Sequence, residues 1–296
     1  MCLDLKRLTE CKMLKKKDSM LLKIWNVLWP LFIYGIAQNV VYFFGTLLFG
    51  DSRYAVVYIL IAAIICIPVY YSIYRKDQQA AAETKKNIPM DNKDYLAIII
   101  SGAALALAMN NVISLTPLPV WFPGYEDTNE ILYQGGMFLQ ILSAGIFGCI
   151  VEEVSMRGVV YLRMKRYWGK QRAMILSALV FGIYHLNVVQ AVYAFVLGLF
   201  FAWLYERYDS LWAPCIAHMS ANLFIILLAE STVFSHILGT MVGFCLVTCI
   251  SVMLFYYGMR WLKQTNPVKE LRFVDKEPDT LQKLTAEYKE QEREEE

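Results

Sequence analysis

Long apolar runs separated by short polar segments dominate the chain. Most of them reach the roughly 20 residues that a helix needs to cross a hydrocarbon core about 30 Å thick. The pattern therefore predicts an all-α polytopic membrane protein with about eight transmembrane helices. The expected spans are 24–49, 54–74, 95–115, 131–162, 172–187, 189–205, 211–229 and 233–262.

Composition supports this assignment. Apolar residues make up 57% of the chain, and the mean hydropathy is +0.41. We expect no cleavable signal peptide, because the N-terminus is charged over its first 23 residues and the first apolar run is too long for a signal sequence. The lipid bilayer is the expected partner, and no feature suggests nucleic-acid binding.

Lysine and arginine residues alternate between the two sides of the predicted bundle. The tail to Lys23 holds seven, the 75–94 loop five, the 163–172 loop five, and the tail from Arg260 eight. The intervening loops on the other side hold only Arg53. Under the positive-inside rule, this distribution places both termini in the cytoplasm. We expect a multi-pass protein of a bacterial cell membrane.

Three charged residues interrupt the apolar segment 137–162: Glu152, Glu153 and Arg157. Ionisable residues inside a membrane span are costly, and so they are functional candidates by default. Glu153 and Arg157 are four residues apart and can pair on one helical face. Glu152 points about 100° away and has no local counter-ion.

Two further polar pairs lie in later spans. Phe181 and His185 occur in FGIYHLN, and His218 and Asn222 lie one turn apart in SLWAPCIAHMSANL. A lone buried histidine often has only a structural role. Two histidines together with an unpaired glutamate favour chemistry, because imidazole and carboxylate groups transfer protons near neutral pH.

These residues suggest peptide hydrolysis. Glu152 is the natural base for a water molecule that His185 also holds, and His218 with Asn222 offers hydrogen bonds to the oxyanion. Arg157 would hold Glu153 in place. Alternatively, His185, His218 and Glu152 could bind zinc with an open fourth position. We favour chemistry without a cofactor and keep zinc as the rival.

The three motifs together resemble the CPBP family of intramembrane endopeptidases, which includes CAAX proteases, Abi proteins and bacteriocin-processing proteins. The resemblance covers roughly 130–230 and implies the same site roles for Glu152, His185, His218 and Asn222, supported by Glu153, Arg157 and Phe181. It implies a glutamate-dependent or metallo-endopeptidase that cleaves a membrane-associated peptide or protein, in CAAX-type or in peptide-pheromone or bacteriocin-type processing.

This interpretation divides the chain into five parts. They are a cytoplasmic basic tail 1–23, N-terminal transmembrane helices 24–115, a catalytic core 130–230, a last transmembrane helix 231–262 and a cytoplasmic charged tail 263–296. Two alternatives remain open. One is a non-catalytic regulator or bacteriocin self-immunity protein of the same fold. The other is a transporter, although no internal repeat typical of transporters is evident.

Overall fold

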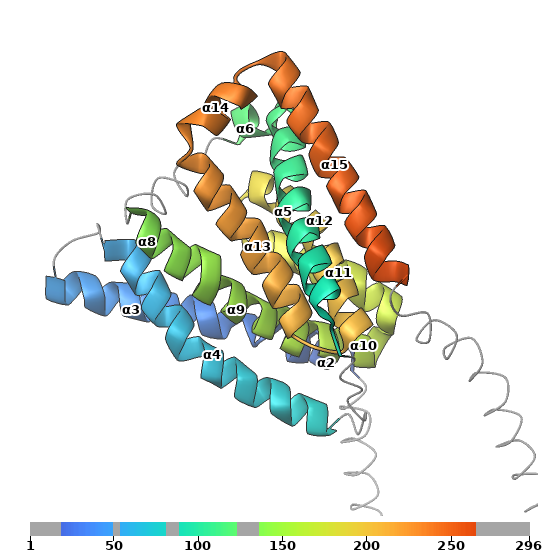
Figure 1. The fold of residues 1–296 in the computed structure, drawn as a ribbon. Coiled ribbons are helices and arrows are strands. Elements are labelled where there is room, and N and C mark those ends of the chain that lie inside the picture. The colour runs from blue at the N-terminus through green and yellow to red at the C-terminus, as the bar shows by residue number, and fades with distance from the viewer. Residues whose placement is uncertain (1–18, 50–53, 81–88, 123–135, 265–296) are drawn as a thin grey trace, which may run out of the picture.

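The computed structural model describes residues 19–49, 54–80, 89–122 and 136–264, and within these ranges it contains helices and turns but no strand (Figure 1). The predicted all-α membrane fold is confirmed. Most of the two predicted tails, 1–23 and 263–296, lies outside the described residues.

The described residues form α-helices and two π-helical stretches. In chain order they are α2 (Met20–Leu28), α3 (Leu31–Phe49), α4 (Ala55–Ala80), α5 (Asn92–Ser114), α6 (Leu118–Trp121), α8 (Gly136–Gln140), η2 (Ile141–Phe147), α9 (Gly148–Glu153), η3 (Val154–Tyr161), α10 (Leu162–Trp168), α11 (Lys170–Tyr184), α12 (Val188–Tyr208), α13 (Trp212–Ala229), α14 (Thr232–Leu238) and α15 (Met241–Gln264).

Seven helical segments of the described chain are long and apolar enough to cross a membrane. The sequence-based count of eight is higher because the expected span 172–187 corresponds to α11, which has only 15 residues. Such a helix extends about 22 Å, less than the thickness of a hydrocarbon core. The expected last span is also divided, since α14 ends before Gly239 and α15 begins at Met241.

The segments rich in basic residues lie at one end of the bundle. In Figure 1, the C-terminal ends of α4 and α15, the start of α5 and α10 lie toward the bottom, whereas α6 and α14 lie at the top. This arrangement agrees with the alternation of charge along the chain. The side of the membrane that each end faces stays a prediction.

The first span is broken at Pro30, between α2 and α3. Proline lacks an amide hydrogen and clashes with the preceding helical turn, so it interrupts a helix. Two tyrosines satisfy carbonyl groups at the break. Tyr70 of α4 donates to the Pro30 carbonyl over 2.7 Å, and Tyr184 of α11 donates to that of Leu31 over 3.3 Å. The N-terminal helices are thereby joined to α4 and α11.

One continuous helical segment, Gly136–Trp168, runs through the bundle and carries the two glutamates. It contains two stretches of π-helix, η2 and η3, which lie on either side of α9. π-Helical turns are rare and are frequently found at functional sites. The segment packs against α4 on one side and α13 on another.

The position of α13 depends on a close approach to α5. A side chain at Gly102 of α5 would collide with the carbonyl oxygen of Ala217 and with the Ser220 hydroxyl. Only glycine therefore allows the two helices to lie this close. The contact is one residue from His218, so it sets how far that histidine reaches into the bundle.

We expect the basic end of the bundle to face the cytoplasm. On a cysteine-free background, Lys76→Cys should react with a thiol reagent only after the membrane is permeabilised, because residue 76 lies near the basic C-terminal end of α4. Val120→Cys should react in intact cells. Labelling of residue 76 from outside, with residue 120 protected, would reverse the topology.

Candidate active site

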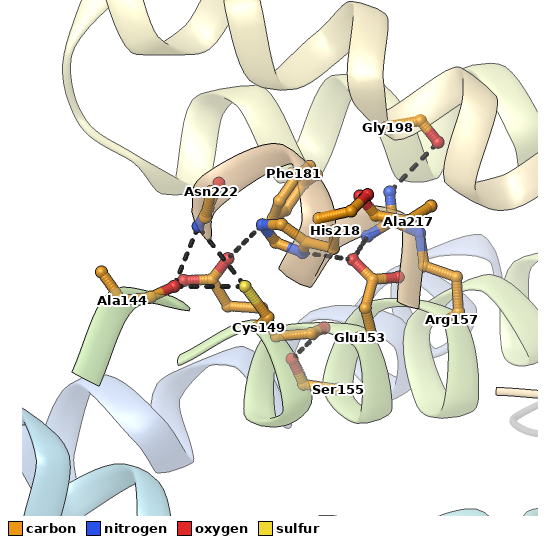
Figure 2. A network of polar contacts seen from close by, with 12 residues as sticks. Ala144, Cys149, Glu153, Ser155, Arg157, Phe181, Gly198, Ala217, His218 and Asn222 are labelled. Carbon is orange, nitrogen blue, oxygen red and sulfur yellow. Dashed lines mark hydrogen bonds and ion pairs between the residues drawn. The ribbon is translucent and has the colours of Figure 1, made fainter. Parts of the chain in front are cut away.

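The predicted ion pair between Glu153 and Arg157 is present inside the bundle (Figure 2). Arg157 Nη1 donates to Glu153 Oε1 over 2.8 Å, and both side chains are fully buried. The pair spans the junction of α9 and η3. Removing one partner of such a pair leaves an uncompensated buried charge, so each residue depends on the other.

Two phenylalanine rings and a backbone carbonyl surround the Arg157 guanidinium. Its Cζ lies 4.6 Å from the centre of the Phe181 ring and 5.3 Å from that of Phe201. Aromatic faces attract cations, especially away from water. Nη2 donates to the Gly198 carbonyl over 3.1 Å, and a Cβ at residue 198 would lie only 3.3 Å from this nitrogen. Helices α11 and α12 thus complete the arginine site.

His218 joins the ion pair from α13. Its Nδ1 lies 2.8 Å from Glu153 Oε1. A carboxylate accepts hydrogen bonds, so Nδ1 carries the hydrogen and, in the neutral ring, Nε2 is an acceptor. The ring stacks on Phe201, with 4.8 Å between ring centres, and lies edge-on to Phe181. Glu153 therefore fixes the tautomer of His218, and the two aromatic rings fix its plane.

Glu152 differs from Glu153 in exposure and partner. Its side chain is 24% exposed, whereas that of Glu153 is fully buried. Glu152 Oε2 lies 3.8 Å from His218 Nε2. That distance exceeds a direct hydrogen bond and suits a bridging water. The predicted pairing of Arg157 with Glu153 rather than Glu152 is confirmed.

His185 lies at the C-terminal end of α11 and contacts Phe181. Its Nδ1 is 2.8 Å from the Phe181 carbonyl oxygen, and its ring lies edge-on to the Phe181 ring at 5.0 Å. Since a carbonyl accepts, Nδ1 carries the hydrogen and Nε2 is again an acceptor. Within the described chain, His185 forms no hydrogen bond to Glu152 or His218. Phe181 connects the two histidines.

Asn222 points toward the π-helical segment (Figure 2). Its Nδ2 donates to the Ala144 carbonyl over 2.9 Å and lies 3.4 Å from Cys149 Sγ. The Cys149 thiol also donates to the Ala144 carbonyl, over 3.1 Å. Both amide hydrogens of Asn222 thus have partners in η2 and α9. The predicted role of this amide at an oxyanion stays a prediction.

The residues suggested for zinc do not form a complete ligand set. No three His, Cys, Asp or Glu side chains of the described chain come together closely enough to hold a metal ion. His218 and Glu152 face each other, but His185 has its contacts with Phe181. A zinc site would require all three to lie about 2.0–2.2 Å from one ion.

Sequence reasoning missed three members of the network. Gly198 and Phe201 lie in an apolar stretch of α12 that contains several similar residues, and no pattern distinguishes these two from their neighbours. No sequence signal marks Cys149 either, because a thiol in a membrane span usually acts as a small apolar residue. Only the packing of α12 and α9 around Arg157 and Asn222 reveals them.

These helices and this network define a polytopic membrane protein with a buried glutamate–histidine site. Residues 134–224 match the family model described as type II CAAX prenyl endopeptidase Rce1-like. This match supports the resemblance to the CPBP family that the three motifs suggested. The matched region contains Glu152, His185, His218 and Asn222.

A curated relative supports this assignment. The chain is 25% identical over 185 residues to the Bacillus subtilis protein named "Putative membrane peptidase YdiL", and the alignment covers 60% of this chain and 73% of the relative. No solved structure matches the chain.

Replacing Glu153 should damage the fold more than replacing Glu152. Glu153→Gln removes the charge that balances Arg157, and breaking a buried pair typically costs about 3–5 kcal/mol. We expect a lower thermal unfolding temperature in detergent and less protein in the membrane fraction. Glu152→Gln is the matched control and should stay close to wild type in both measurements. The reverse result would exchange the two roles.

Proposed function

We propose that the chain is a membrane-embedded endopeptidase in which Glu152 activates a water molecule. The facing pair of Glu152 Oε2 and His218 Nε2, separated by 3.8 Å, carries this proposal. Both atoms accept hydrogen bonds when His218 is neutral. A water molecule between them could donate one hydrogen to each, which would leave its oxygen lone pairs free for attack.

The proposed reaction takes place between a water molecule, the scissile peptide and Glu152. The water oxygen forms a bond to the carbonyl carbon of the scissile peptide, while Glu152 takes the water proton. The carbon–nitrogen bond then breaks, and Glu152 gives that proton to the leaving amine. Glu153 and Arg157 do not touch the substrate in this scheme. They hold His218 in the tautomer that presents Nε2 to the water.

His185 has a secondary place in the proposal. Its Nδ1 bond to Phe181 leaves Nε2 as an acceptor, which suits a second contact to the water or to a substrate amide. The Phe181 ring touches both histidines and Arg157, so it sets their spacing. This packing explains why a phenylalanine belongs to the motif alongside His185.

The proposed substrate is a peptide or protein associated with the membrane. Glu152 lies in a transmembrane segment, so a soluble protein could not bring an ordinary folded surface to it. The family match and the name of the relative support peptidase activity. Within this class, we propose either CAAX-type processing or processing of a peptide pheromone or bacteriocin.

Glu152→Gln should abolish proteolysis without loss of protein. The amide keeps the shape of the side chain but cannot take a proton from water. We would compare membrane-associated peptides in cells that express wild type or Glu152→Gln, using mass spectrometry of newly formed termini. Identical peptides in both cells, at equal protein levels, would rule out the peptidase and favour a non-catalytic regulator or immunity protein.

We propose that the reaction proceeds without a metal. The purified chain should cleave its substrate at an unchanged rate after exhaustive chelation, and elemental analysis should find no stoichiometric transition metal. A zinc enzyme would instead contain about one equivalent, which His185→Ala and His218→Ala would lose. An inactive metal-free protein whose activity zinc restores would overturn the metal-independent mechanism.

A further inference from the structure

The proposed reaction depends on the orientation of the His218 ring. Its Nε2 must face Glu152 Oε2, which lies 3.8 Å away, for one water molecule to bridge the two atoms. A hydrogen bond from Nδ1 to Glu153 Oε1, over 2.8 Å, anchors the ring at its other nitrogen. A planar ring held at one atom can still pivot about that bond. The orientation of Nε2 therefore depends on what packs against the face of the ring.

Phe201 of α12 covers one face of the His218 ring. The two ring centres are 4.8 Å apart, and the ring planes meet at 25°, which is a stacked arrangement. Phe181 instead meets the same ring at 83°, with 5.8 Å between the ring centres. Of these two contacts, only the one with Phe201 is nearly parallel to the imidazole. A tilt of the His218 ring out of its plane would bring it into collision with Phe201.

Phe201 also contacts Arg157, the other partner of Glu153. Its ring centre lies 5.3 Å from Arg157 Cζ, within the range of a cation–π interaction. One turn earlier on the same face of α12, the Gly198 carbonyl accepts a hydrogen bond from Arg157 Nη2. The Phe201 ring thus touches both groups that bind the Glu153 carboxylate. It holds the histidine in place relative to the buried ion pair.

Tight helix packing sets the position of the Phe201 ring. A Cβ at residue 198 would lie only 3.1 Å from Ala178 Cα, so α12 and α11 pack closely one turn from Phe201. The Phe201 side chain is 0% exposed. A side chain buried in this way touches neither the proposed water molecule nor a substrate. Any effect of Phe201 on catalysis must therefore act through His218.

We propose that Phe201 is a positioning residue, whose ring keeps His218 Nε2 directed at the water molecule beside Glu152. This inference rests on the proposed peptidase function. It adds a residue of α12 to the site, although none of the three sequence motifs lies on that helix. It requires a flat ring at position 201, which an aliphatic side chain cannot replace.

The first measurement is enzymatic. A peptide whose cleavage in cells disappears in Glu152→Gln is synthesised and supplied to the full-length protein in proteoliposomes. Phe201→Leu keeps an apolar side chain but removes the ring, and it should lower kcat roughly 10- to 10²-fold, the effect of a misplacement near 1 Å. KM should change little, because the buried side chain does not touch the substrate. Phe201→Tyr keeps the ring and should stay within a few-fold of wild-type kcat.

Phe200→Leu is the matched control. Phe200 is 5% exposed, and its ring packs on Trp203 and on Phe255 of α15. Both leucine variants lose one buried ring, so both should have a lower thermal unfolding temperature. Only Phe201→Leu should lower kcat per folded molecule. Wild-type kcat in Phe201→Leu would overturn the inference, as would an equal loss in Phe200→Leu or a Phe201→Tyr protein as slow as Phe201→Leu.

The second measurement observes the His218 ring directly and requires no cleavage. The chain has three histidines, so protein with isotope-labelled histidine gives few ring signals, and those of His218 are absent in His218→Gln. Nitrogen NMR in proteoliposomes should show one set of His218 signals, with Nδ1 protonated, in wild type and in Phe200→Leu. In Phe201→Leu these signals should broaden or split, because the ring takes more than one orientation.

The two measurements separate failure of the inference from failure of the proposed function. His218 signals that are unchanged in Phe201→Leu would overturn the positioning role of Phe201, whatever the activity. If no cleavage depends on Glu152, the proposed peptidase function fails, and the NMR spectra still decide whether Phe201 orients His218.

Discussion

The fully buried ion pair of Glu153 and Arg157 determines the arrangement of the core. A guanidinium in this position must be neutralised and hydrogen-bonded, because an unpaired charge inside a membrane protein is costly. Glu153 comes from its own segment, the Gly198 carbonyl from α12, and the flanking ring of Phe181 from α11. His218 of α13 then binds the same carboxylate oxygen. Four parts of the fold thus contact this one ion pair. They can pack only in ways that keep its hydrogen bonds and ring contacts.

This dependence explains why two adjacent glutamates have different environments. Successive side chains on a helix point about 100° apart, so only one of the two can face Arg157. Glu153 faces inward and is fully buried, whereas Glu152 keeps 24% of its side chain exposed and faces the far nitrogen of His218. Water and a substrate can reach only the second carboxylate. In the proposed reaction, the first glutamate therefore acts through His218, and the second acts on water directly.

Much of this architecture follows from the sequence, because apolar length and the positions of charges are strong signals. They predicted the all-α membrane fold and the pairing of Glu153 with Arg157. Hydropathy could not reveal the π-helical stretches around α9, since the same residues satisfy either helical pattern. It also counted α11 as a membrane span, although this helix has only 15 residues. The bonds of Asn222 depend on the Ala144 carbonyl, a backbone group without any sequence signature.

The contacts of the N-terminal helices could not be predicted from the sequence either. These helices contain no charged motif that points to chemistry, and their apolar composition predicts only that they cross the membrane. Yet Pro30 breaks the first of them where Tyr70 and Tyr184 can bind the carbonyl groups near the break. These bonds hold the broken helix against α4 and α11, and nothing in the apolar sequence predicts them.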